Sequence, residues 1–280
     1  MTAFMFPGQG SQYPNMARDF HDNFKTAKLI FEKIEDFTSI NLRKIIFSDN
    51  DELLNQTDIT QLSIFASSAA IFYTLIDENK IIFDENSVML GHSLGEYTAL
   101  TCSKKLSLED ASILLKKRGS LMHNALEKNT YGMAALIGSP VSEIYEIIKE
   151  NNLNLDLAND NSPIQVVISG KIKDLDKSEE IFKKHSTKKF IKLNVSSSFH
   201  SKYMIEAQND LNNFIQKVNF QENKIKIISN YSANYSDNNI EIIEALKKQM
   251  ANTVNWTKSI KNLESVNEKN IIEIGPGKVL

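Results

Sequence analysis

Cysteine is almost absent from this chain of 280 residues, in which Cys102 is the only one. An internal disulfide is therefore impossible, and a structural zinc site built on thiolates is excluded, so we expect no metal. Neither sign of charge predominates, because 32 basic residues stand against 35 acidic residues and the net charge is -3. This balance provides no general attraction to nucleic acid or to an anionic membrane, and we expect neither as a partner.

Signals for export or membrane anchoring are also lacking. The segment Met1–Gly8 has no charged region followed by a long apolar run, and we expect that no stretch approaches the ~20 apolar residues of a membrane span. We therefore expect a cytoplasmic protein without an anchor, which suits the single thiol. Hydrophobic residues make up 41% of the chain, enough for the substantial core of a globular protein.

What is present is the apolar pattern of an α/β protein. Short apolar runs at 88–90 and 271–274 are bounded by turn residues, as buried strands are, and they alternate with segments of helical period. From Thr60 to Ile76 the apolar side chains recur at the spacing of a helix with a buried face. The main body is therefore predicted to be a sheet covered by helices.

The middle of the chain has a second pattern. It predicts strands at 133–137, 153–158, 165–169 and 188–195, and helices at 141–150 and 174–184. Their order is βαββαβ, which is typical of a ferredoxin-like unit. We expect this small subdomain at residues 128–192, inserted between the two parts of a larger subdomain, 1–127 and 193–280.

One short motif points to chemistry. The predicted strand ending at Leu90 is followed by Gly91-His92-Ser93-Leu94-Gly95 and by a helix-compatible run over 96–102. Strand, sharp turn and helix form a nucleophile elbow, in which the glycines leave room for the turn. Ser93 is thus the candidate nucleophile of an acyl-transferring enzyme. The structural alternative is a serine that merely occupies a tight turn.

A serine hydroxyl needs a base to take its proton, and histidine is the usual base near neutral pH. His200 follows a predicted strand, in the kind of loop where catalytic groups are often held. His92 is expected to point away from the turn. The other three, His21, His123 and His185, lie in helical, largely polar surroundings. A loop histidine in a local hydrogen bond is the alternative for His200.

Arg118 stands on an apolar helix face. Ser107 and Asp110 predict a capped helix start, and the apolar stripe that follows includes position 118. A guanidinium there is costly unless it is paired, and its planar fork suits a carboxylate. The partner is either an acidic residue of the protein or a carboxylate of the substrate.

Six segments together carry a resemblance that covers nearly the whole chain. They are Phe6–Gln12, Gly91–Tyr97, Lys117–Gly119, Asn161–Gly170, Phe199–Ser201 and Ile274–Leu280. In this order they resemble the malonyl-CoA:acyl carrier protein transacylases of fatty acid synthesis. The resemblance implies an α/β-hydrolase-like large subdomain, the inserted ferredoxin-like small one, and an active site between them.

The resemblance also implies roles for individual residues. Ser93 would attack the malonyl thioester, and His200 would act as base and then as acid. The backbone N–H groups of Gln9 and Leu94 would form the oxyanion hole. A backbone carbonyl near Gln249, in place of a carboxylate, would orient the histidine.

Other implied positions bind or surround the acyl group. They are Arg118, which would hold the malonyl carboxylate, and Gln61, Met122, Asn159, Asn161, Gln165 and Phe199. Phe199 matches relatives that prefer malonyl over the bulkier methylmalonyl group. The implied reaction is ping-pong transfer from malonyl-CoA to the phosphopantetheine thiol of acyl carrier protein, so coenzyme A is a substrate and no cofactor is expected. A monomer is the expected state.

Other readings stay open from the sequence. A serine hydrolase or editing acyl-hydrolase would share the elbow and the base, and a polyketide-type acyltransferase would differ only in its carrier. A non-catalytic carrier-binding module is the alternative from another class.

Because acyl carrier proteins are acidic, a basic patch would assist docking. Lys183, Lys184, Lys188 and Lys189 are candidates for it, with a solvated helix end as the alternative.

Overall fold

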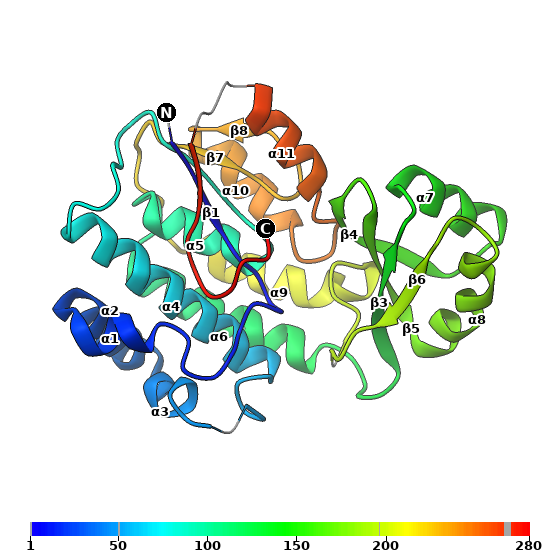
Figure 1. The fold of residues 1–280 in the computed structure, drawn as a ribbon, viewed down its shortest axis with the longest axis horizontal. Coiled ribbons are helices and arrows are strands. Elements are labelled where there is room, and N and C mark those ends of the chain that lie inside the picture. Colours follow the sequence, from blue (N-terminus) through cyan, green and yellow to red (C-terminus); the bar gives the residue numbers. More distant parts are fainter. Residues whose placement is uncertain (1, 50, 196, 266–269) are drawn as a thin grey trace.

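The computed structural model describes residues 2–49, 51–195, 197–265 and 270–280. Its elements form two lobes side by side, each with its own sheet (Figure 1). We call the larger lobe, on the left of the view, the large subdomain and the other the small subdomain. The predicted α/β fold with two subdomains is confirmed.

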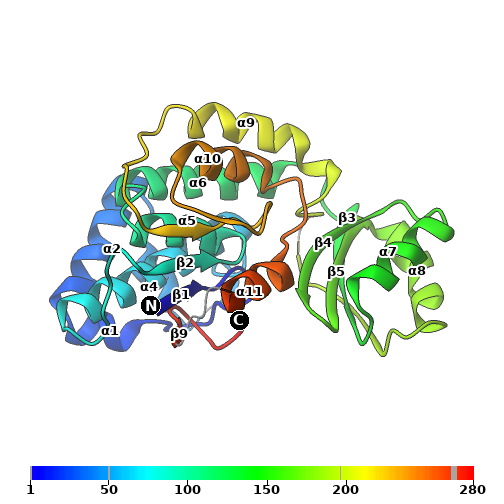
Figure 2. The ribbon, with the colours of Figure 1, turned by 90° about the horizontal axis from the view of Figure 1, so that it is seen from above.

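The large subdomain contains a five-stranded sheet in the order β8-β7-β2-β1-β9. The strands are β8 (Tyr235–Ser236), β7 (Lys226–Ile228), β2 (Val88–Gly91), β1 (Thr2–Phe6) and β9 (Asn270–Glu273). All neighbours pair in parallel except β8 with β7. The central strands β1 and β2 are almost wholly buried, as expected for parallel strands covered on both faces by helices (Figure 2).

Helices of the large subdomain surround this sheet. They are α1 (Arg18–Asn23), α2 (Lys25–Thr38), α3 (Leu42–Ile46), α4 (Thr57–Asp77), α5 (Leu94–Cys102), α6 (Leu108–Asn124), α9 (Ile205–Ile215), α10 (Asn239–Lys248) and α11 (Trp256–Ser265), with a short 3-10 turn at Lys202–Met204. The predicted cap of α6 is present, because the Ser107 hydroxyl accepts a hydrogen bond of 2.9 Å from the Asp110 amide.

Helix α4 corrects one expectation. Its 21 residues have a mean hydropathy of 1.6 over their most apolar window, which by length and composition is enough to cross a membrane. The expectation that no stretch approaches this limit was therefore wrong for residues 57–77. However, 72% of the window is buried inside the protein, where α4 packs against α2, α5 and α6. Its position at the centre of a packed subdomain explains the apolar composition.

The small subdomain contains a four-stranded antiparallel sheet in the order β4-β5-β3-β6. Its elements are β3 (Tyr131–Ile137), α7 (Val141–Glu150), β4 (Leu155–Ser162), β5 (Gln165–Lys171), α8 (Ile172–Lys183) and β6 (Lys189–Lys192). This is the predicted βαββαβ unit, and Leu136, Ile168 and Phe182 belong to its separate core. Strand β6 ends earlier than predicted, because Leu193 and Val195 turn into a cavity between the subdomains.

The subdomains are tied together where β4 ends. Asp160 donates its amide to the Val254 carbonyl at 3.0 Å, and Val254 donates to the Ala158 carbonyl at 2.9 Å. The Thr257 hydroxyl adds a bond of 2.6 Å to the Asp160 carboxylate. Strand β4 is therefore fixed against the start of α11, close to the turn that carries Ser93.

Candidate active site

The turn between β2 and α5 has the geometry of a nucleophile elbow. Ser93 lies between these elements with φ 52° and ψ -107°, a conformation that side-chain-bearing residues rarely adopt. A Cβ atom on Gly91 would lie 2.1 Å from the backbone of Gly95, and one on Gly95 would lie 2.2 Å from the carbonyl oxygen of Phe6. Both glycines are thus required by close packing, and the strained turn presents the Ser93 hydroxyl at the end of the strand.

His200 is placed as the base. Its Nε2 lies 2.8 Å from the Ser93 Oγ, and its Nδ1 lies 3.0 Å from the backbone carbonyl oxygen of Gln249. A carbonyl only accepts, so Nδ1 carries the proton and Nε2 is free to accept from the serine. Burial, followed by the charge of Arg118, lowers the pKa of His200 to about 3. The imidazole is therefore neutral near pH 7, which is the state that a base requires.

Arg118 lies beside the same hydroxyl, with 1% of its surface exposed. Its Nη1 donates to the Gln61 Oε1 at 2.6 Å, and its Nη2 donates to the Gln249 Oε1 and the Ser93 Oγ, each at 2.9 Å. Across the described ranges no carboxylate lies within ion-pair distance of it, and its Nε has no hydrogen-bond partner. Burial lowers the pKa of Arg118, and the charge of the nearby Glu96 works in the opposite direction. The side chain is thus a buried cation held by neutral groups, and the acidic residue considered from the sequence is not its direct partner.

A cavity of about 90 Å³ opens directly onto Ser93. Its lining includes Gln9, His92, Leu94, Arg118, Met122, Met133, Asn159, Leu193, Val195, Phe199 and His200. Gly8 lets the loop with Gln9 approach the elbow, because a Cβ there would lie 2.5 Å from the carbonyl oxygen of His92. Gln61 stands behind the cavity, between Arg118 and the Met122 sulfur, to which its Nε2 lies at 3.3 Å.

A larger cavity of about 620 Å³ adjoins the first and shares part of its lining, including Gln9 and Asn159. Asn161 and Gln165 reach it from the small subdomain, and Gln12 and Asn55 from the large one. Its volume lies within the range of small-molecule and cofactor sites. The two cavities together connect the Ser93 hydroxyl with the cleft between the subdomains.

His92 directs its ring to the small subdomain and not to the Ser93 hydroxyl. Its Nε2 lies 2.9 Å from the Asn161 Oδ1, the Trp256 ring is 5.5 Å away between centroids, and the residue borders both cavities. The reason is that β4 lies across the elbow and provides a hydrogen-bonding amide there. Burial lowers the pKa of His92, so it is neutral near pH 7 and contributes a contact between the subdomains, not a charge.

Comparison with known proteins gives a consistent result. The family described as acyl transferase domain matches residues 3–280. The chain belongs to this acyl transferase family. A malonyl CoA-acyl carrier protein transacylase of Bacillus subtilis is 34% identical over 282 residues, which cover 99% of this chain and 87% of that protein.

Two further relatives agree. The polyketide biosynthesis malonyl CoA-acyl carrier protein transacylase BaeC of Bacillus velezensis is 32% identical, over 100% of this chain and 94% of that protein. The crystal structure of the malonyl CoA-acyl carrier protein transacylase from Clostridium perfringens has a TM-score of 0.91 at 33% identity and covers 99% of this chain and 87% of that one. The protein is an acyltransferase with the two-subdomain fold of these transacylases.

Two residues of this acyltransferase site were missed from the sequence. Asn230 accepts from the Ser93 amide at 2.7 Å and donates to the Gly91 carbonyl at 2.7 Å. Glu96 is fully buried, and its Oε2 accepts from the Gln249 Nε2 at 2.7 Å. An acidic residue in the apolar run of α5 is the same kind of signal that identified Arg118. Asn230 gives no signal, because it lies 137 positions from its partner.

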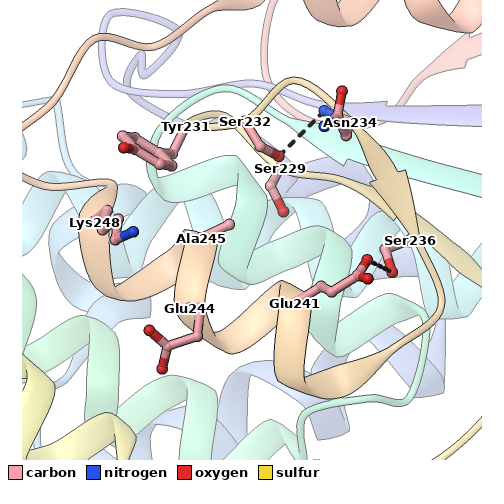
Figure 3. A pocket seen from close by; sticks show the side chains of 9 residues that line it. All are labelled: Ser229, Tyr231, Ser232, Asn234, Ser236, Glu241, Glu244, Ala245 and Lys248. Carbon is pink, nitrogen blue, oxygen red and sulfur yellow. Dashed lines mark hydrogen bonds between the residues drawn. The ribbon is translucent and has the colours of Figure 1, made fainter.

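The candidate docking lysines do not line the cavities at Ser93. Lys183 forms an ion pair of 2.7 Å with Glu179, and neither cavity at Ser93 is lined by Lys183, Lys184, Lys188 or Lys189. A pocket of about 280 Å³ between α10 and residues 229–236 shares no lining residue with the cavities at Ser93, and in it Glu241 points to the Ser236 hydroxyl (Figure 3). In the part of the chain that the structure describes, no group of His, Cys, Asp or Glu could hold a metal ion.

Proposed function

We propose that this acyltransferase moves a malonyl group from malonyl-CoA to the phosphopantetheine thiol of acyl carrier protein, through an ester on Ser93. The buried guanidinium of Arg118 carries this proposal, since it lies 2.9 Å from the nucleophile and forms no ion pair with a carboxylate among the described residues. Burial of this cation without an ion pair is costly, and burial accordingly lowers the pKa of Arg118. An acyl group that ends in a carboxylate supplies the missing anion in bidentate geometry.

In the first half-reaction the Ser93 oxygen attacks the thioester carbonyl while its proton passes to the Nε2 of His200. The negative charge that develops on the carbonyl oxygen is stabilised by the backbone N–H groups of Gln9 and Leu94, which both border the cavity at Ser93. Such a donor contributes about 3 kcal/mol in comparable sites. The C–S bond then breaks, and the imidazolium returns the proton to the leaving thiolate of coenzyme A.

The second half-reaction reverses these roles. The carrier thiol gives its proton to His200 and attacks the malonyl ester, and the C–O bond to Ser93 breaks as the serine regains a proton. Coenzyme A and the carrier bear the same pantetheine arm, so each occupies the cavity of about 620 Å³ in turn. A single channel for both is consistent with ping-pong transfer.

The remaining features of the proposal concern the selectivity for the acyl group, the cofactor requirement, the oligomeric state and the cellular location. Phe199 is buried at the edge of the cavity and restricts space around the malonyl methylene, which favours malonyl over methylmalonyl. Coenzyme A takes part as substrate and product, and no cofactor enters the reaction. We further propose that the enzyme acts as a monomer in the cytoplasm, in fatty acid synthesis.

Product analysis tests the proposal. The enzyme is incubated with malonyl-CoA and the phosphopantetheine-bearing carrier, and malonyl-carrier and free malonate are both quantified. We expect malonyl-carrier as the main product, because His200 and Arg118 hold the ester for attack by the thiol. Free malonate as the main product, with or without carrier, would show that the protein is an acyl-hydrolase. An absence of both products would favour a non-catalytic carrier-binding module.

A polyketide carrier is the second candidate for the acceptor, because BaeC of Bacillus velezensis, a polyketide biosynthesis transacylase, is 32% identical over the full chain. Competition between a fatty acid carrier and a polyketide carrier at equal concentration separates the two. We expect the fatty acid carrier to be loaded faster. Preferential loading of the polyketide carrier would reassign the pathway and leave the chemistry unchanged.

A further inference from the structure

Glu96 is a buried acid with an unexplained position. It lies in the first turn of α5, three residues after Ser93, and none of its surface is exposed. Its Oε2 accepts from the Gln249 Nε2 at 2.7 Å and from the Asn230 amide at 3.1 Å. Burial of a carboxyl group costs free energy unless hydrogen bonds within the protein replace those to water.

Both donors to this oxygen also hold the elbow. The Gln249 Nε2 donates to the Ser93 carbonyl at 2.8 Å, while the Asn230 Oδ1 accepts from the Ser93 amide at 2.7 Å. The peptide groups on the two sides of the nucleophile are therefore fixed by residues that converge on one oxygen of Glu96.

This oxygen also determines which way the Gln249 amide faces. The Nε2 of Gln249 meets two acceptors, Glu96 Oε2 and Ser93 O, and its Oε1 meets the Nη2 donor of Arg118. In the flipped orientation oxygen would face both acceptors and the amide N–H groups would face the guanidinium. Without the Glu96 oxygen, one of the three contacts that enforce the correct orientation of the Gln249 amide is lost.

We propose that Glu96 is a positioning residue that acts through Gln249 on the guanidinium of Arg118, and thereby on the preference for a malonyl group. This proposal rests on the proposed function, in which Arg118 holds the malonyl carboxylate. We assign this action of Glu96 to its acceptor oxygen Oε2, although burial lowers the pKa of Arg118 and the charge of Glu96 works in the opposite direction. Its Oε1 has no hydrogen-bond partner within the described ranges, so a proton on that oxygen leaves Oε2 free to accept.

The environment of Glu96 supports the acceptor role. Burial raises the pKa of Glu96 to about 7, although the bond from Gln249 works in the opposite direction. Both protonation states are therefore populated near neutrality, and both keep Oε2 as an acceptor. A glutamine at this position would keep one acceptor oxygen in the same place, whereas a methionine or an alanine would keep none.

The test compares Glu96→Gln, Glu96→Met and Glu96→Ala with the wild type. Glu241→Gln is the matched control, since Glu241 is exposed and lies in the pocket between α10 and residues 229–236 (Figure 3). For each protein kcat and KM are measured with malonyl-CoA and with acetyl-CoA, which lacks the carboxylate. Both substrates are measured on one preparation, so the ratio of their kcat/KM values does not depend on the folded fraction.

We expect Glu96→Gln and the control to keep the malonyl-over-acetyl ratio within about threefold of the wild type, because the acceptor remains. Glu96→Met and Glu96→Ala should lower it by about tenfold, mainly through a higher KM for malonyl-CoA. An unchanged ratio in both of these variants overturns the proposal, as does a Glu96→Gln variant that loses as much as they do. A wild type without any malonyl preference would refute the proposed function instead.

Discussion

The two subdomains contribute to the site in different ways. In the large subdomain Ser93 and Arg118 are fixed by hydrogen bonds of 2.6–2.9 Å with three separate segments of the chain. The small subdomain has its own core and sends mainly cavity-lining side chains, such as Asn159, Asn161 and Gln165. The groups that form and break bonds thus belong to the large subdomain, while the antiparallel sheet of the small subdomain covers the channel. Substitutions in the first should affect reaction steps, and those in the second should affect binding.

Ser93→Ala should have the largest effect, because it removes the nucleophile itself. We expect formation of malonyl-carrier to fall by at least ~10³-fold. Rates of malonyl-carrier formation measure it, with the exposed Ser120→Ala on α6 as control. Residual transfer above a hundredth of the wild-type rate would mean that the acyl group travels by another route.

Arg118→Ala should be next, with a loss of about 10²-fold in kcat/KM for malonyl-CoA, as for the removal of one partner of a buried charge pair. Acetyl-CoA should lose much less, because it has no carboxylate to pair. Arg118→Lys should have a kcat/KM for malonyl-CoA between those of the wild type and Arg118→Ala, since a lysine keeps the charge and lacks the planar fork of the guanidinium. Equal losses for both substrates would assign Arg118 to the chemical step and not to selectivity.

Phe199→Ala tests the junction of the subdomains. Removal of this buried ring enlarges the cavity next to Ser93, and we expect the preference for malonyl over methylmalonyl to fall by about tenfold. Competition between the two CoA esters in one reaction measures the change. If the preference is unchanged, the selectivity lies in another part of the lining.

Asn161→Ala tests the small subdomain. It removes the 2.9 Å bond to the His92 ring, so KM for the carrier and for malonyl-CoA should rise by about fivefold with little change in kcat. The exposed Asn151→Ala, at the end of α7, is the control. A large fall in kcat would contradict the division of roles between the subdomains.

The smallest expected effect is that of mild acid on the acylation rate. With its pKa lowered to about 3, His200 stays neutral as the pH falls through 6.5, and the rate of ester formation should stay level there. Rapid-quench rates at several pH values test this. A fall with a midpoint near 6.5 would show that the histidine titrates as if it were exposed.

The same pKa has a consequence for stability. Between pH 6.5 and about 3 the unfolded chain binds a proton at His200 that the folded protein does not, so acidification destabilises the fold. The fall of Tm across this range should be smaller in His200→Gln than in the wild type. Glu96 titrates in both proteins, so its contribution cancels in the comparison. An identical fall in both would contradict the lowered pKa.

The sequence predicted much of the fold and the centre of the site. The βαββαβ order, the helix with Arg118 and the turn at Ser93 follow from local patterns, which periodicity and glycine spacing reveal. The contacts of His92 with Asn161 and of Ser93 with Asn230 could not be predicted, because they join distant segments through tertiary packing. Strand β6 was predicted too long for the same reason, since the chain beyond Lys192 leaves the sheet after a last bond from Leu193 to Met133 and then lines a cavity.

The most direct test of this account is the location of the acyl group on the protein. The enzyme is incubated with malonyl-CoA alone, and the modified residue is mapped by mass spectrometry of peptides before and after addition of the carrier. We predict a malonyl ester on Ser93 that disappears as malonyl-carrier forms. An acyl group on a residue outside the elbow, or one that the carrier does not remove, would contradict the account.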